Sequence, residues 1–112
     1  SIEFMMELDV IKALSALAHP VRLKVFRALV VSGERGLTPG VMGQGLGIPA
    51  TTLSFHLREL TAAGLVRPER ASRHLVYRAA YDAMNGLLAY LTENCCQGAA
   101  CATSESVAEC KC

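Results

Sequence analysis

Two short helical segments joined by the tight turn Gly47-Ile48-Pro49 constrain the fold more than any other feature. Residues 39–46 before the turn and residues 50–63 after it carry apolar side chains at the spacing of a helix. Three leucines lie at positions i, i+4 and i+7 of the second segment and therefore share one face: Leu53, Leu57 and Leu60. Two helices joined by a short glycine-containing turn form either a helix-turn-helix or an ordinary helical hairpin.

The segment that follows these helices separates the two interpretations. Two short, β-prone runs lie over Leu65–Arg70 and His74–Arg78, with Ala71–Arg73 as the turn between them. Pro68 indicates that the first run is an edge strand, because proline has no N–H to give to a neighbour. A hairpin directly after the second helix is typical of a winged helix-turn-helix. The fold class is therefore predicted to be mainly α, with about five helices and a β-hairpin wing.

Three further helices are expected from the apolar periodicity. Two of them cover Met6–Ala18 and Pro20–Val31, because Pro20 disfavours helix at the residue before it and suits the first turn of a new one. The last covers Tyr81–Asn94. The apolar surface of the first and last helices is broad, which predicts that they pair between two copies of the chain. Residues 5–94 are thus expected to form one DNA-binding and dimerisation domain.

Length and composition limit the classes of protein that the chain can represent. With 112 residues, of which 52% are hydrophobic, it has room for one domain with a modest core. No apolar run approaches the roughly 18–20 residues of a membrane span. Without a recognisable secretion signal, a cytoplasmic location with reduced cysteines and no membrane partner is expected. Residues 1–4, ahead of Met5-Met6, resemble a cloning remnant and are left out of the fold prediction.

The distribution of charge is more informative than the net charge of +1. Residues 50–80 hold five arginines against two glutamates, which makes a local basic surface of the kind that meets DNA. Hydroxyl, imidazole and guanidinium groups bond to base edges and phosphates. The candidate DNA contacts are the outward side chains of the second helix and of the wing tip: Thr51, Thr52, Ser54, His56, Arg58, Arg70, Arg73 and His74.

One recognition helix alone would bind DNA weakly, so a homodimer is predicted to bind double-stranded operator DNA. A two-fold dimer presents two recognition helices to major-groove half-sites roughly 34–36 Å apart, which implies a palindromic operator. The affinity is expected to fall steeply as salt concentration rises, because binding releases the counterions of the phosphates.

Several of these segments resemble the ArsR/SmtB family of metal-responsive repressors. Leu17–Leu23 is similar to the start of that family's second helix, and Ser54–Val66 to its recognition-helix signature. Arg70 together with Tyr77 matches its wing. The resemblance covers about Leu8–Leu91 and implies a transcriptional repressor that dimerises through its first and last helices.

Two features depart from the family. The wing turn carries Ser72 where the family usually has glycine, so the geometry of the turn is in question. The family's best-known arsenic site is a cysteine pair in the first helix of the helix-turn-helix, and Leu37–Leu46 contains no cysteine. The sensor site is therefore expected elsewhere in the chain.

All five cysteines lie in the tail, residues 95–112, where little else could form a core. Cys95 and Cys96 follow the last helix, and the small residues after them can turn back and bring Cys101 to the pair. Three thiolates without a fourth ligand nearby suit a soft ion with three sulfur ligands. Trivalent arsenic is the predicted inducer, with trivalent antimony as the close alternative, and no organic cofactor is expected. The grouping also resembles C-terminal arsenic sites in some members of the family.

Other interpretations of the tail stay open. Cys110 or Cys112 could supply a fourth sulfur to a structural zinc ion, although adjacent cysteines are atypical of zinc sites. Cadmium, lead, a thiol-redox response and a tail with no specific ligand are the remaining possibilities. A small thiol enzyme is disfavoured, because the chain has neither a C-x-x-C motif nor a phosphate-binding loop. The chain is predicted not to be an enzyme.

Overall fold

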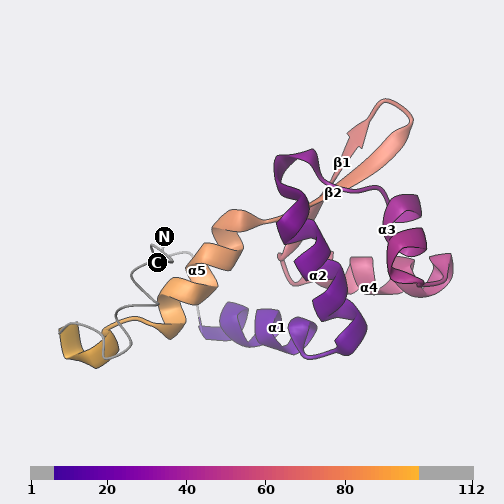
Figure 1. The fold of residues 1–112 in the computed structure, drawn as a ribbon. Coiled ribbons are helices and arrows are strands. Elements are labelled where there is room, and N and C mark those ends of the chain that lie inside the picture. The colour runs from indigo at the N-terminus through magenta and orange to yellow at the C-terminus, as the bar shows by residue number, and fades with distance from the viewer. Residues whose placement is uncertain (1–6, 99–112) are drawn as a thin grey trace.

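The computed structural model describes residues 7–98, and within them five α helices and one two-stranded hairpin follow in chain order (Figure 1). The helices are α1 (Glu7–Leu17), α2 (Pro20–Ser32), α3 (Pro39–Leu46), α4 (Ala50–Ala62) and α5 (Tyr81–Leu91). The strands are β1 (Val66–Ala71) and β2 (His74–Ala79), and short 3-10 turns lie at Gly33–Arg35 and Cys95–Gly98. This arrangement confirms the predicted winged helix-turn-helix.

Local chemistry explains where the helices begin and end. The Nδ1 atom of His19 accepts a hydrogen bond from the Val21 N–H (3.1 Å), so His19 caps α2, whose first residue is proline. Thr38 caps α3 in the same way, and Gly47 ends α3 with a left-handed φ of 68°. The turn between α3 and α4 therefore consists of Gly47, Ile48 and Pro49, as the sequence predicts.

The periodicity predicts that the last helix continues to Asn94, but in the structure it ends at Leu91. The hydroxyl of Thr92 donates to the carbonyl oxygen of Leu88 (2.8 Å), and Asn94 adopts a φ of 60°, which takes the backbone out of the helix. The apolar pattern extended the prediction too far because it contains no signal for such a left-handed residue. Among the described helices, none combines the length and apolarity that crossing a bilayer requires.

The core lies where α1, α2 and α4 meet the base of the wing. The three leucines predicted to share one face of α4 are each at most 1% exposed. They pack in one cluster with side chains from the other helices and from β1, including Val10, Val25, Leu29, Met42, Leu65, Val66 and Leu87. This cluster fixes α4 against α2, so the opposite face of α4 is turned outward.

The wing is attached to the body through Leu37, which precedes α3. The N–H and C=O groups of Tyr77 in β2 bond to the C=O and N–H of Leu37 at 2.8 and 3.0 Å. On its other side Tyr77 is paired with Pro68, which has no N–H to offer. Pro68 thus lies on the outer strand, as predicted, and the hairpin is closed by a two-residue turn, Ser72-Arg73.

Candidate nucleic-acid interface

The outward face of α4 carries four of the five side chains that the sequence assigned to it. Thr51, Thr52, Ser54 and Arg58 are all exposed. Within the described chain no side chain caps the start of α4, where Pro49 is the N-cap residue. The first N–H groups of the helix and the positive end of its dipole therefore lie beside the two threonines, an arrangement that favours a phosphate.

The prediction that His56 points outward is wrong. Its side chain is buried, at 6% exposure, and its Nδ1 atom accepts a hydrogen bond from Nε of Arg22 (3.1 Å). The His19 ring lies 4.5 Å away, between ring centroids. The physical reason is the spacing: His56 is three residues after Leu53 and four before Leu60, so it falls on the leucine face of α4.

The surroundings of His56 keep its imidazole neutral. Burial lowers the pKa of His56, and the neighbouring His19 and the Arg22 guanidinium lower it further, against a small opposing effect of Glu59. Arg22 also lies over the ring of the neighbouring Phe55, 5.7 Å from its centroid. These contacts join α2 to α4 and were missed in the sequence, where Arg22 has only the pattern of a solvated helix residue.

The three wing residues are exposed around the hairpin tip. Arg70 pairs with Leu75 in the ladder, His74 pairs with the last residue of β1, and Arg73 lies in the turn. Ser72, the first residue of the turn, holds a positive φ of 61°. Type II′ turns normally have glycine at this position. The wing turn therefore has the geometry expected with glycine, and the backbone of Ser72 is strained because serine has a Cβ atom.

Ion pairs divide the five arginines of residues 50–80 into two groups. Arg67 bonds to Asp82 (2.9 Å), and Arg78 bonds to Glu69 across the wing. Arg58, Arg70 and Arg73 form no ion pair with any residue between 7 and 98. Within residues 50–80, the cationic surface that can meet phosphates is therefore narrower than the composition suggests and lies on α4 and the wing tip.

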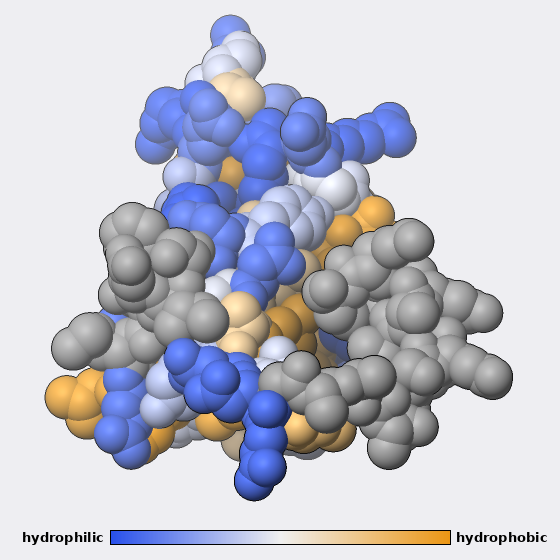
Figure 2. Space-filling view, turned by 90° about the vertical axis from the view of Figure 1, so that its left-hand side faces the viewer, coloured by the Kyte–Doolittle hydropathy of each residue, from blue (hydrophilic) through white to orange (hydrophobic). Residues whose placement is uncertain are grey.

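A separate apolar surface lies at the other end of the molecule. Helix α1 turns Val10, Ala13 and Ala16 to the core and leaves a second row of large side chains outside. In Figure 2, which looks at the end that carries α1 and α5, hydrophobic side chains reach the surface in the lower part and the wing above is hydrophilic. The exposed residues of this apolar face are Leu8, Ile11, Leu14, Leu88 and Leu91, each 42–75% exposed.

The two cysteines that the structure describes lie directly beyond α5. Cys95 and Cys96 are exposed, and their Sγ atoms are 3.6 Å apart. Cys101, the third predicted ligand, lies outside the described residues, as do Cys110 and Cys112. Within residues 7–98, no three His, Cys, Asp or Glu side chains gather to form a metal site.

Comparison with known proteins identifies the DNA-binding part. A helix-turn-helix domain family matches residues 17–69. The HTH-type transcriptional regulator YgaV of Escherichia coli (strain K12) is 29% identical over 83 residues, which cover 74% of this chain and 82% of YgaV. A possible transcriptional regulator for arsenical resistance has a similar structure, with a TM-score of 0.62, 31% identity, and coverage of 71% of this chain and 80% of that one.

A third similar structure is the homodimeric winged helix-turn-helix DNA-binding domain of a possible ArsR-family transcriptional regulator from Mycobacterium bovis. Its TM-score is 0.62 at 26% identity, with 77% of this chain and 79% of that chain covered. The chain is an ArsR-type winged-helix transcriptional regulator. The relatives of this regulator are transcription factors and not enzymes, which confirms the prediction that it is not an enzyme. The matched helix-turn-helix segment stops before α5 and the cysteines, so the similarity of that segment concerns DNA binding.

Proposed function

We propose that this regulator is a homodimeric repressor that binds operator DNA and releases it when trivalent arsenic binds to Cys95, Cys96 and Cys101. The observation that carries the proposal is the pair of exposed thiols, 3.6 Å apart, at the end of the helix that bears part of the apolar face. The structural relative named for arsenical resistance, at 31% identity, supports the same ligand.

Dimerisation is supported by the apolar face on α1 and α5. Exposed leucine and isoleucine side chains on two neighbouring elements are costly in water and are typical of a protein–protein interface. The Mycobacterium bovis relative is homodimeric. A two-fold axis through this face would place the two α4 helices on the same side of the dimer, each with its wing beside it, as binding to successive major grooves requires.

DNA docking is supported by Arg58, Arg70 and Arg73, which form no ion pair with any described residue, and by the open start of α4. With its first turn in the major groove, α4 would bring Thr51, Thr52 and Ser54 to base edges and Arg58 to a base or phosphate. Arg70, Arg73 and His74 at the wing tip would contact the backbone or the minor groove. His56 has no part in this contact and instead holds α4 on α2.

The thiols suit a soft ion chemically and sterically. Two bonds of about 2.3 Å, the length that sulfur makes to zinc, can span up to about 4.6 Å between sulfurs, so the 3.6 Å separation lets both thiolates reach one ion. Cys101 would supply the third sulfur. Closing the tail onto the pair would rearrange the residues after Leu91, next to the apolar face. A change in the spacing of the two α4 helices then lowers the affinity for DNA.

The test is operator release by arsenite in single cysteine variants. Cys95→Ser, Cys96→Ser and Cys101→Ser should each abolish the response, while Cys110→Ser and Cys112→Ser serve as matched controls from the same tail and should keep it. Apo proteins should bind the operator equally. X-ray absorption at the arsenic edge should count three sulfurs per arsenic. A full response in all three of the first variants would contradict the site.

The 3.6 Å separation also favours a second candidate, a thiol-redox repressor on the same scaffold. Hydrogen peroxide would take two electrons from two thiols: one S–S bond forms, the O–O bond breaks, and the two oxygens leave with the thiol protons as two water molecules. The two candidates differ in the signal: release of DNA by peroxide and not by arsenite would establish the redox function. Cadmium and lead are tested in the same release assay.

A further inference from the structure

Helix α5 is joined to the DNA-binding body at its first turn. The hydroxyl of Tyr81 donates to the carbonyl oxygen of Val30 at the end of α2 (2.9 Å). The next residue, Asp82, accepts a hydrogen bond from the guanidinium of Arg67 in β1 (2.9 Å). Both contacts lie at the end of α5 opposite to the cysteines, so the first turn is where α5 and the body are held together by directed bonds.

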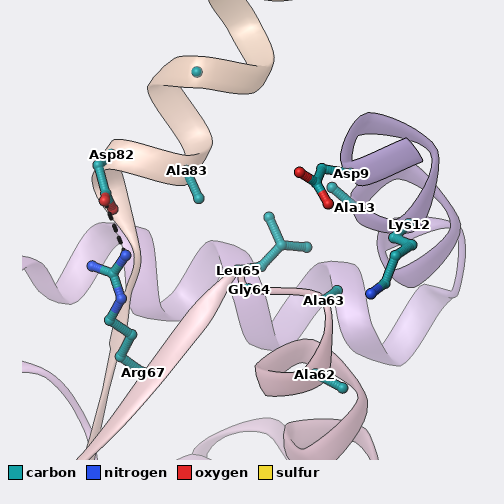
Figure 3. Close-up of a pocket in the computed structure, with 11 residues that line it drawn as sticks. Asp9, Lys12, Ala13, Ala62, Ala63, Gly64, Leu65, Arg67, Asp82 and Ala83 are labelled. Carbon is teal, nitrogen blue, oxygen red and sulfur yellow. Dashed lines mark hydrogen bonds and ion pairs between the residues drawn. The ribbon is translucent and has the colours of Figure 1, made fainter. Parts of the chain in front are cut away.

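Beyond this turn, packing against α1 is incomplete. A cavity of about 440 Å³ lies between α1, α5, the end of α4 and the start of β1. Figure 3 shows Arg67 and Asp82 at one side of this cavity and Asp9 and Lys12 of α1 at the other. The residues that α5 turns to it, Ala83 and Gly86, are small. The side chains at the cavity therefore do little to fix the angle of α5, and the packing of this helix on the core comes from other residues, among them Leu87 and Met84.

The ion pair is placed where it can fix that angle. Arg67 belongs to β1, the strand that continues to Arg70 and the wing tip, and Asp82 lies in the first turn of α5. A carboxylate is favoured at a helix N-terminus, and the hydrogen bond from Arg67 holds the pKa of Asp82 below its ordinary value. Asp82 thus stays ionised at neutral pH, and the wing and α5 remain linked by opposite charges.

We propose that Arg67 and Asp82 are positioning residues for DNA binding, because their ion pair sets the angle between the wing and α5. This inference rests on the proposed DNA-binding dimer. In that dimer α5 belongs to the shared interface, so the angle determines how the two wings and the two α4 helices are spaced. The opposing possibility is that Asp82 merely masks a cation that would otherwise contact phosphate.

The two possibilities predict opposite results for Asp82→Asn. If Asp82 only masks Arg67, its neutralisation frees a cation and strengthens DNA binding. If the pair positions the wing, the variant binds more weakly. An exposed ion pair changes an equilibrium by about 1.4- to 5-fold, and the dimer holds two pairs, so a loss of about 2- to 25-fold is expected. The side chains are 63% and 68% exposed, which places the pair in this class.

A double-mutant cycle removes the effect of net charge. The full-length variants are Arg67→Asp, Asp82→Arg and the exchange of both, and the measurement is the dissociation constant for a duplex that the wild-type protein selects from random sequence. The exchanged pair should restore binding, with a coupling factor of about 2 to 25. The same cycle on Glu69 and Arg78, a pair between the two strands of the wing, should give a factor near 1. Arg78 also donates to the carbonyl oxygen of Glu34, but both variants that replace Arg78 lose this bond, so it cancels in the cycle.

Each result decides the inference. A factor of 1 for Arg67–Asp82 overturns it, even if thermal unfolding shows coupling, because the pair would then stabilise the fold without positioning the wing. Equal factors for the two pairs also overturn it, since they indicate general stabilisation of the wing. Failure of the wild-type protein to select any duplex overturns the proposed function and, with it, this inference.

Discussion

Replacing Gly36 by alanine tests how the wing is held on the body. Gly36 precedes Leu37, the residue that bonds to Tyr77 in β2, and its backbone adopts φ 71° and ψ −178°. Residues with a side chain almost never adopt this conformation. A Cβ atom at this position would lie 2.6 Å from Cγ1 of Val76, 2.7 Å from the carbonyl oxygen of Tyr77 and 2.9 Å from Cγ of Arg78. The carbonyl oxygen of Tyr77 cannot move away, because the backbone of Tyr77 is held by its pairing with Leu37 and Pro68.

The size of the effect follows from two contributions. The backbone conformation costs a residue with a side chain about 1–3 kcal/mol. Overpacking against a fixed backbone oxygen adds about 1–3 kcal/mol. The free energy of unfolding should therefore fall by about 2–6 kcal/mol in Gly36→Ala, which corresponds to at least about 8 °C in melting temperature for a domain of this size. Because the strain lies at the wing attachment, operator affinity should fall with it.

Gly33→Ala is the matched control for the steric contribution. Gly33 has a similar backbone, with φ 66° and ψ −148°, but a Cβ atom there would meet nothing within 4 Å. Its cost should be the backbone contribution alone, about 1–3 kcal/mol. Urea unfolding followed by circular dichroism measures both variants on one scale. If Gly36→Ala were no less stable than Gly33→Ala, the close approach of the wing would play no part in the stability of the protein.

Substitutions at the wing tip, the buried histidine and the apolar face test other parts of the structure. Ser72→Gly should raise the free energy of unfolding by about 1 kcal/mol, because glycine takes the positive φ without strain; an unchanged urea midpoint would refute this. The free energy of unfolding should fall as the pH drops below 6.5, the ordinary pKa of histidine. In this range the unfolded chain binds a proton at His56, whereas the folded chain, in which the pKa of His56 is lowered, stays unprotonated. The dependence of the free energy of unfolding on pH should be weaker in His56→Gln. Leu88→Glu should raise the dimer dissociation constant at least about 100-fold by sedimentation velocity, because two unpaired carboxylates enter the interface. Val31→Glu, at an exposed apolar residue of α2, should leave it unchanged.

Much of the fold is predictable because its signals are local. The leucine spacing of α4, the glycine turn before it and the proline at the start of α2 each determine the conformation of their own segment. Pro68 likewise indicated its place on the outer strand from its missing N–H alone. These features require no knowledge of what lies elsewhere in the chain, and the structure confirms them.

The features that escaped prediction depend on residues far apart in the sequence. The contact of Arg22 with His56 joins α2 to α4, and that of Arg67 with Asp82 joins β1 to α5. Glycine at position 36 is required by side chains of β2. His56 is an intermediate case, since its spacing from Leu53 and Leu60 already placed it on the buried face, and its polarity alone suggested the surface.

The contacts that hold the first turn of α5 are weak enough for a ligand at the other end of the helix to disturb them. A 100-fold loss of DNA affinity needs about 2.7 kcal/mol. The Arg67–Asp82 pair is exposed and contributes about 0.2–1 kcal/mol. The hydrogen bond from Tyr81 to Val30 contributes about 0.5–1.5 kcal/mol. With two copies in a dimer, these contacts together supply roughly 1.4–5 kcal/mol, a range that includes the required value. A ligand at the far end of α5 therefore needs only to disturb the first turn of this helix, and the leucine core around α4 can stay intact.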